Sequence, residues 1–188
     1  MSLSFFKSCA LVLLSAVSCA VFMSGSFAQS APPVQEITKQ IIRSVTGYAN
    51  AISCPHVEVE PKQIAALVPY KTMDDRMDAK YAILWLGDIG CAGGTGTEGT
   101  RLSIVTIRAG DSYVVDPLQS SPAIQFESPV RGVERIVGNT RDSLILEGME
   151  HGPKDPNCCP SIKVRFTLRV DKKGNWKLVE KKTMPAKK

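Results

Sequence analysis

Histidine is scarce in this sequence, and several motifs that mark common enzymes are missing. Only His56 and His151 are present, and no Gly-x-Ser-x-Gly motif occurs. A serine hydrolase of that type would lack its nucleophile turn, and few residues are left to serve as a general base. The Cys-x-x-Cys spacing of zinc sites and the Gly-Lys-Ser/Thr ending of a phosphate-binding loop are absent as well. These absences disfavour the enzyme classes that depend on those motifs.

The overall composition is that of an ordinary globular protein. Hydrophobic residues make up 44% of the 188 residues and charged residues 22%, as expected for a folded single domain. Lys and Arg number 23 against 18 Asp and Glu, so the net charge is only +5. That excess is small for a dedicated nucleic-acid-binding protein. We therefore expect no nucleic-acid partner.

The first 28 residues have the features of a secretory signal peptide. Lys7 is the only charged residue before Glu36, and it precedes an apolar run of 15 residues from Cys9 to Met23. Ser26-Phe27-Ala28 supplies the small residues that signal peptidase recognises, so we expect cleavage after Ala28. The run is shorter than the roughly 20 residues needed to span a bilayer. The expected product has no transmembrane span and is periplasmic or secreted.

A lipid anchor is the alternative fate of this segment. Ala16-Val17-Ser18-Cys19 fits a loose lipobox, in which Cys19 would become a lipidated N-terminus. The residues after Cys19 are still apolar, whereas a lipoprotein usually turns polar there. Cleavage after Ala28 is therefore preferred, and a lipid-anchored envelope protein is the alternative.

Signal cleavage leaves four cysteines, Cys54, Cys91, Cys158 and Cys159. Four cysteines in an exported chain predict two disulfides. A bond between the neighbours Cys158 and Cys159 requires an eight-membered ring, so we expect each of them to pair with Cys54 or Cys91, in an order that the sequence leaves open. The alternative is a thiol metal or redox site that combines the neighbouring pair with His151 or His56. Because an oxidising compartment disfavours free thiolates, we expect structural disulfides, no metal and no cofactor.

Hydrophobic periodicity predicts an α+β fold. Between residues 34 and 51 apolar residues recur every three or four positions, as in an amphipathic helix, and residues 61–68 are predicted to form a second, short helix. Alternating patterns predict strands over residues 80–86, 101–108, 113–115, 133–137, 143–147, 162–170 and 176–179. Because the helix comes first and hairpins follow, we expect an N-terminal helix packed on a twisted antiparallel sheet of hairpins. Disulfides would pin this single domain of residues 34–180.

Basic residues gather near the C-terminal end of the chain. In the strand over residues 162–170, alternation places Lys163, Arg165 and Arg169 on the face opposite the apolar residues. Further lysines lie in residues 181–188, which we expect to be a flexible tail, as residues 29–33 are a disordered lead-in. No aromatic residues interleave the basic ones, which weakens a nucleic-acid interpretation. We interpret the face as a solvated sheet surface.

Two loops are the most distinctive candidates for binding. Residues 87–99 are rich in glycine and connect two predicted strands; they form either an anion-binding nest or, as we prefer, a disulfide-anchored connection around Cys91. The second loop precedes the cysteine pair and contains His151, which with Glu150 or Asp155 is the acid–base candidate of an alternative function, a cell-wall hydrolase. The candidate contact residues are Gly93, Gly94, Thr95, Gly96, Thr97 and Glu98 in the first loop, and Glu150, His151, Asp155 and Asn157 in the second.

Two cysteine-containing strings carry a resemblance to a known family. Asp155-Pro-Asn-Cys-Cys-Pro-Ser161, followed by an alternating strand, and Cys91-Ala-Gly-Gly-Thr-Gly96 resemble the LppP/LprE type of exported bacterial lipoprotein over residues 79–180. The resemblance implies a cell-envelope protein with a compact cysteine-pinned domain, and it brings no established activity. It supports Cys91, Cys158 and Cys159 as structural cysteines. Lipid anchoring is not carried over, because the lipobox at Cys19 is weak.

Together these features favour an exported, non-enzymatic binding protein of the bacterial cell envelope. A crosslinked scaffold with distinctive loops and no recognisable catalytic set is typical of inhibitor- or immunity-like proteins. The expected partner is another protein or a cell-wall component, and the sequence leaves that choice open. If Cys91 pairs with Cys158 or Cys159, the two candidate loops lie close together, and replacing Cys91 would disturb both.

Overall fold

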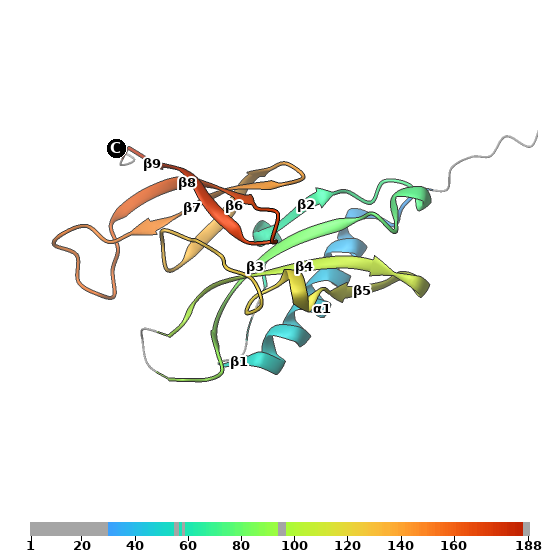
Figure 1. Cartoon of the computed structure of the whole chain (residues 1–188), viewed down its shortest axis with the longest axis horizontal. Helices are drawn as coiled ribbons and strands as arrows, with labels where there is room; N and C mark the ends of the chain where they lie inside the picture. The colour runs from blue at the N-terminus through green and yellow to red at the C-terminus, as the bar shows by residue number, and fades with distance from the viewer. Residues whose placement is uncertain (1–29, 55–56, 58, 94–96, 186–188) are drawn as a thin grey trace, which may run out of the picture.

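A computed structural model describes residues 30–54, 57, 59–93 and 97–185. One long helix, α1 (Val34–Ile52), precedes a series of antiparallel strands, which establishes the predicted α+β class (Figure 1). The strands are β1 (Ser53–Cys54), β2 (Ile64–Val68), β3 (Lys80–Ile89), β4 (Gly99–Arg108), β5 (Ser112–Val115), β6 (Val133–Asn139), β7 (Ser143–Glu150), β8 (Ile162–Val170) and β9 (Trp176–Thr183). Short 3₁₀ turns are η1 (Pro61–Gln63), η2 (Met73–Asp75), η3 (Ala109–Asp111) and η4 (Pro117–Gln119).

The elements form three layers, namely the helix and two antiparallel sheets. A five-stranded sheet has the order β1-β3-β4-β5, with β2 also paired to β3, and β6 to β9 form a second, four-stranded sheet in sequence order. α1 covers one face of the first sheet, and the second sheet covers the other (Figure 1). The predicted helix packed on an antiparallel sheet is confirmed. The second sheet was not predicted, because alternation along a strand identifies its two faces but not the strands with which it pairs.

α1 forms because its apolar residues make one continuous stripe. Ile37, Ile41, Val45 and Ala49 are spaced four residues apart, and each is at most 5% exposed. Side chains at this spacing lie on one face of a helix. They pack against β3, β4 and β5. The predicted amphipathic helix is confirmed.

β3 is buried on both faces, which explains its uninterrupted apolar sequence. Tyr81, Ile83 and Trp85 contribute to the core beneath α1, whereas Ala82 and Leu84 contribute to the core between the two sheets. From the second sheet, the inward-facing residues of β8 and β9 complete the inter-sheet core; they are Val164, Phe166, Leu168 and Trp176. The alternation predicted for residues 162–170 is therefore confirmed.

Residues 61–68 form η1 and β2, so the helix predicted there is wrong. Ala65 and Leu67 are buried in the inter-sheet core, and the β2 backbone pairs with β3. A short apolar segment of this kind fits either a helix or a strand by its pattern alone. In the structure, residues 64–68 form a strand because their backbone pairs with β3.

Both ends of the described chain are more ordered than the sequence predicts. In the predicted lead-in, the Ala31 N–H donates to the Lys71 carbonyl (3.1 Å), and Ser30 forms an isolated bridge with Thr72. β9 continues to Thr183, which pairs with Val164 and so extends strand structure into the predicted flexible tail. Backbone pairing with neighbouring segments accounts for both differences.

Two disulfides are present, but their pairing differs from the prediction. Cys54 is bonded to Cys91, and Cys158 is bonded to its neighbour Cys159. β1 pairs with the end of β3, which brings the Cα atoms of Cys54 and Cys91 to 5.1 Å. Cys158 and Cys159 lie between β7 and β8, in the other sheet. Because Cys54 and Cys91 are already paired, the expected cross-pairing is wrong.

No helix within the described residues is long and apolar enough to cross a membrane. The predicted signal peptide, with its cleavage site at Ala28 and the alternative lipid site at Cys19, lies outside the described residues.

Candidate functional site

The Gly-rich loop is held at both of its described ends. The Gly93 N–H donates to the Asp88 carboxylate (2.9 Å), and the adjoining Cys91 is fixed by its disulfide. On the other side, the carbonyls of Thr97 and Glu98 accept hydrogen bonds from arginine side chains (3.2 and 3.4 Å). The predicted contact residues Gly94, Thr95 and Gly96 lie outside the described residues.

The groups proposed for acid–base chemistry each have a separate partner. His151 is exposed, and its Nε2 lies 3.1 Å from the Asn157 carbonyl oxygen. The Glu150 carboxylate forms an ion pair with Lys181 (2.7 Å). Within the described residues, no hydrogen bond joins His151 to Glu150 or Asp155. The arrangement gives no support to a hydrolase built on these three residues.

Asp155 organises its own loop. Its carboxylate accepts hydrogen bonds from the Gly152 N–H (2.6 Å), the Ser161 N–H (2.7 Å) and the Ser161 hydroxyl (2.8 Å). The Gly152 N–H and the Ser161 hydroxyl are the main causes that lower the pKa of Asp155. An ionised carboxylate with these bonds explains the loop conformation, so Asp155 has a structural role here.

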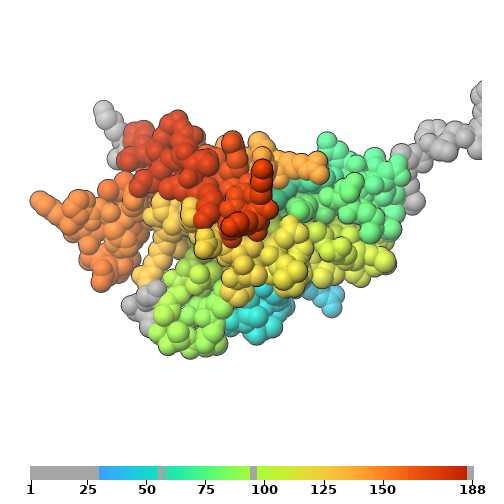
Figure 2. Space-filling model, in the orientation of Figure 1, coloured from blue at the N-terminus to red at the C-terminus, as the bar shows by residue number. Residues whose placement is uncertain are grey.

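The two predicted loops lie at the same end of the molecule but belong to different sheets (Figure 1; Figure 2). The expectation that a disulfide from Cys91 joins them is wrong, because Cys91 is bonded to Cys54. Replacing Cys91 would therefore break no covalent link to the second loop. No group of three or more His, Cys, Asp or Glu residues placed to bind a metal occurs in the part of the chain that the structure describes.

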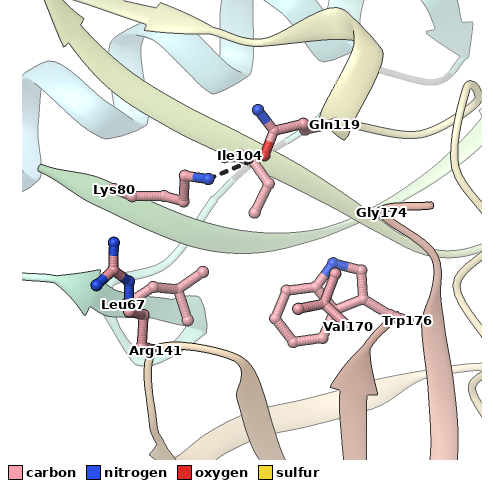
Figure 3. Close-up of a pocket in the computed structure, with 8 residues that line it drawn as sticks. All are labelled: Leu67, Lys80, Ile104, Gln119, Arg141, Val170, Gly174 and Trp176. Carbon is pink, nitrogen blue, oxygen red and sulfur yellow. Dashed lines mark hydrogen bonds between the residues drawn. The ribbon is translucent and has the colours of Figure 1, made fainter. Parts of the chain in front are cut away.

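A pocket that the sequence did not predict opens between the two sheets (Figure 3). Its volume is about 50 Å³. The lining residues are Leu67, Lys80, Ile104, Gln119, Arg141, Val170, Gly174 and Trp176. They come from both sheets and from the turns beside them, so the pocket exists only once the sheets are packed together.

The floor of the pocket is apolar and ends in an indole ring. Figure 3 shows Trp176 and Val170 side by side, opposite Leu67 and below Ile104. Figure 3 shows the indole nitrogen of Trp176 on the upper edge of its ring, and this nitrogen has no hydrogen-bond partner among the described residues. A small apolar group fits this floor, and the indole N–H adds one donor.

Lys80 is fixed at the rim by a relay of hydrogen bonds. Its Nζ donates to Gln119 Oε1 (2.9 Å), and Gln119 Nε2 donates to the Asp116 carboxylate (2.7 Å). Because an ionised carboxylate only accepts hydrogen bonds, Asp116 orients the amide so that its oxygen faces Lys80. The ammonium group is thereby held at the pocket with two of its three N–H bonds unused by Gln119.

The pocket carries two cations and no acid among its described lining residues. Arg141, in the β6–β7 turn, has no hydrogen bond or ion pair among the described residues, and Figure 3 places it on the same side of the pocket as Lys80. Asp142 follows Arg141 in the sequence and Asp171 follows Val170, and both carboxylates accept hydrogen bonds within their own turns. Asp142 accepts from the Thr140 hydroxyl (2.7 Å), and Asp171 accepts from two backbone N–H groups.

The signal that would have pointed to this site is weak in the sequence. Lys80 alternates with Ala82 and Leu84, so a charged residue begins the face of β3 that packs between the sheets. No pattern in the sequence indicates that Arg141 or Gln119 lies close to Lys80. Their approach depends on how the second sheet lies on the first.

No protein-family model matches the chain, and neither a curated protein nor a solved structure matches it. The resemblance to the LppP/LprE type of lipoprotein therefore stays a prediction. The fold and the site define a disulfide-bridged, three-layer α+β protein with a small cationic pocket between its sheets.

Proposed function

We propose that this chain is an exported, non-enzymatic binding protein of the cell envelope. Its inter-sheet pocket holds the carboxyl terminus of a peptide whose last residue has a small apolar side chain. One observation carries the proposal: Lys80 and Arg141 flank an apolar pocket whose described lining residues include no acid. The peptide belongs either to a partner protein or to a cell-wall component, the two classes of partner that the sequence favours.

The charges at the rim favour a carboxylate over a neutral group. Arg presents a planar fork of N–H donors that matches a carboxylate, and Lys adds a compact charge with three donors. Lys80 is already oriented by Gln119. A bound carboxylate would supply the ion pair that both cations lack among the described residues, and such charge-assisted hydrogen bonds are the strong ones.

The size of the pocket limits what accompanies the carboxylate. One buried water occupies roughly 10–15 Å³ on this measure, so about 50 Å³ holds only a few non-hydrogen atoms. A carboxylate with a methyl or similarly short side chain meets that limit, whereas an aromatic side chain does not. The rest of the peptide would lie outside the pocket.

The lining residues favour binding over catalysis. They include no hydroxyl, thiol, imidazole or carboxylate among the described side chains. A role outside the cytoplasm is supported by the Cys54–Cys91 disulfide, which forms readily in oxidising compartments, and by the predicted signal peptide.

The experiment is a titration of ¹⁵N-labelled protein with N-acetyl-L-alanine, followed by NMR. The chain has two tryptophans, so it gives two indole N–H signals. Trp176 lines the pocket, whereas the indole of Trp85 is buried in the other core and donates to the Ser103 hydroxyl (3.0 Å). We expect the Trp176 signal to shift and the Trp85 signal to stay. N-acetyl-L-alanine amide, which lacks the carboxylate, should shift neither.

Two variants test the role of the cations. Arg141→Gln and Lys80→Met should each weaken binding of N-acetyl-L-alanine by about tenfold, because each removes a charged donor. Arg169→Gln removes an exposed arginine from the opposite face of the second sheet and should leave the affinity unchanged. Equal binding of the acid and its amide, or no effect of either rim variant, would contradict the proposal.

A further inference from the structure

A second hollow lies on the helical side of the molecule, between α1 and the edge strand β5. It is a polar groove of about 500 Å³, within the size range of small-molecule sites. The groove is lined by Gln40, Arg43, Ser44, Gly47, Tyr48, Asp111, Ser112 and Tyr113. Figure 1 shows α1 beside β5, and α1 covers the face of the first sheet that is turned away from the second sheet. The groove is therefore separate from the inter-sheet pocket.

Gly47 lies in the interior of α1, where nothing in the fold requires a glycine. Its backbone is helical, it is exposed, and a Cβ added there would meet nothing within 4 Å. Glycine in a helix interior is less favourable than alanine, because glycine loses more backbone freedom on folding. Packing therefore does not explain Gly47. Because Gly47 has no side chain, nothing projects from the helix into the groove at this position. A ligand can therefore approach the helix backbone closely.

The groups around Gly47 combine aromatic rings with hydrogen-bonding side chains. Tyr48 and Tyr113 are both half-buried in the groove. Within the described residues, the Tyr113 hydroxyl has no hydrogen-bond partner, and Arg43 has neither a hydrogen bond nor an ion pair. Tyr48, in contrast, donates its hydroxyl to the Ser121 carbonyl (2.8 Å) and is held in place.

The charges of the groove nearly cancel, which distinguishes it from the inter-sheet pocket. Among the described residues that line it, Arg43 is the one cation, and Asp111 is an acid already paired with Arg76 (3.0 Å). A bound anion would contact Arg43 alone, next to the carboxylate of Asp111. An apolar ligand would bury the polar groups of Gln40, Ser44 and Ser112 without giving them hydrogen bonds, which is unfavourable. A neutral ligand with many hydroxyl groups meets both donors and acceptors here, and its C–H faces can lie on the tyrosine rings.

We propose that this groove binds an uncharged saccharide, with Gly47 as the point of closest approach. Arg43 and the Tyr113 hydroxyl hydrogen-bond to the sugar, and the two tyrosine rings contact its faces. The site is independent of the peptide-terminus site, so either proposal can fail without the other.

The decisive variants are Gly47→Ala and Gly47→Gln. Both replace glycine with a better helix former, so neither should lower the Tm, and the alanine variant should raise it by about 2–4 °C. Both place a side chain in the groove. We expect the alanine variant to weaken saccharide binding several-fold and the longer glutamine side chain to abolish it. Thr46→Ala is the matched control: it also improves helix propensity, but Thr46 does not line the groove.

Binding is measured by NMR titration of the full protein with three neutral disaccharides, namely N,N′-diacetylchitobiose, cellobiose and maltose. We expect at least one of them to shift the backbone amide signals of Gly47, Ser112 and Tyr113 while the Trp176 indole signal stays unchanged. Tyr113→Phe should weaken that binding about tenfold with an unchanged Tm, because the Tyr113 hydroxyl has no hydrogen-bond partner among the described residues that its removal would leave unpaired. The proposal is overturned if none of the three sugars shifts these amides, or if Gly47→Gln binds as well as the unmodified protein.

Discussion

Arg135 and Arg165 bind opposite oxygens of the same buried carboxylate, that of Glu147. Arg135 donates to Oε2 through Nε and Nη2 (3.0 and 2.8 Å), and Arg165 donates to Oε1 through the same two atoms (3.1 and 2.5 Å). The three residues lie directly across from one another on β6, β7 and β8. Glu147 is only 1% exposed, on the outer face of the second sheet, although both arginines remain about half exposed.

This arrangement revises the interpretation of the basic face of β8. The sequence shows Lys163, Arg165 and Arg169 and suggests a solvated surface. Two of these three cations are engaged by Glu147, since Lys163 also lies 3.4 Å from its carboxylate. The cations thus cover a buried acid, which makes the face a structural network as well as a solvated one.

Glu147→Gln should destabilise the fold by about 2 kcal/mol. The amide oxygen can accept from one arginine, but the amide nitrogen would face the other, and the charge that balances both is lost. Because the two arginines are half exposed, water can solvate them, which keeps the loss below that of a fully buried pair. Urea denaturation followed by circular dichroism measures the change. Glu180→Gln, an exposed acid on β9, is the control and should change the stability little.

The stability of the protein should depend on Glu147 in acid. Hydrogen bonds from Arg165 and then Arg135 lower the pKa of Glu147 from 4.5 to about 2. A carboxyl group whose pKa is lower in the folded state stabilises the fold above its unfolded pKa, and this contribution disappears as the pH falls through the folded value. We expect about 3 kcal/mol to be lost from this group between pH 4.5 and about pH 2. Measured over that range, the stability of Glu147→Gln should fall less steeply; parallel curves would contradict the assignment.

The two disulfides should contribute very differently to stability. The Cys54–Cys91 bond closes a segment with a sequence separation of 37, which corresponds to about 4 kcal/mol in the loop-entropy account. Cys158 and Cys159 are neighbours, so their bond closes no loop of the unfolded chain. Replacing both members of the first pair by serine should lower the free energy of unfolding strongly, whereas the same change in the second pair should have little effect. A large loss in the second case would contradict the small contribution expected of the Cys158–Cys159 bond.

Gly87→Ala should be destabilising, in contrast to the helix glycine at position 47. A Cβ at Gly87 would lie 2.5 Å from Cζ3 of Trp85 and 2.8 Å from the Ser53 hydroxyl oxygen. Trp85 is 1% exposed and cannot move away without repacking the core beneath α1. Overpacking of this kind costs about 1–3 kcal/mol. Thermal unfolding of the variant, with the intrinsic fluorescence of the two tryptophans as a second probe, tests the expected loss.

The sequence by itself determines the local elements with strong periodicity. Ile41, Val45 and Tyr48 are spaced by four and then three residues, which places them on one face of a helix but on both faces of a strand. The alternation of Val164, Phe166 and Leu168 places these three residues on one face only in a strand. Such patterns depend on neighbouring residues, so no knowledge of the rest of the chain is needed. The α+β class and the presence of disulfides follow from them and from the cysteine count.

Only the tertiary structure decided how these elements come together. Pairing with β3 made residues 64–68 a strand, and the register of β1 on β3 placed Cys54 beside Cys91. The same packing of one sheet on the other brought Lys80 and Arg141 to one pocket. These relationships join residues that are far apart in the chain. Their geometry depends on which faces of the elements bury the most apolar surface when they pack together. The hydrophobic pattern of a single segment does not identify the segment with which it packs or pairs.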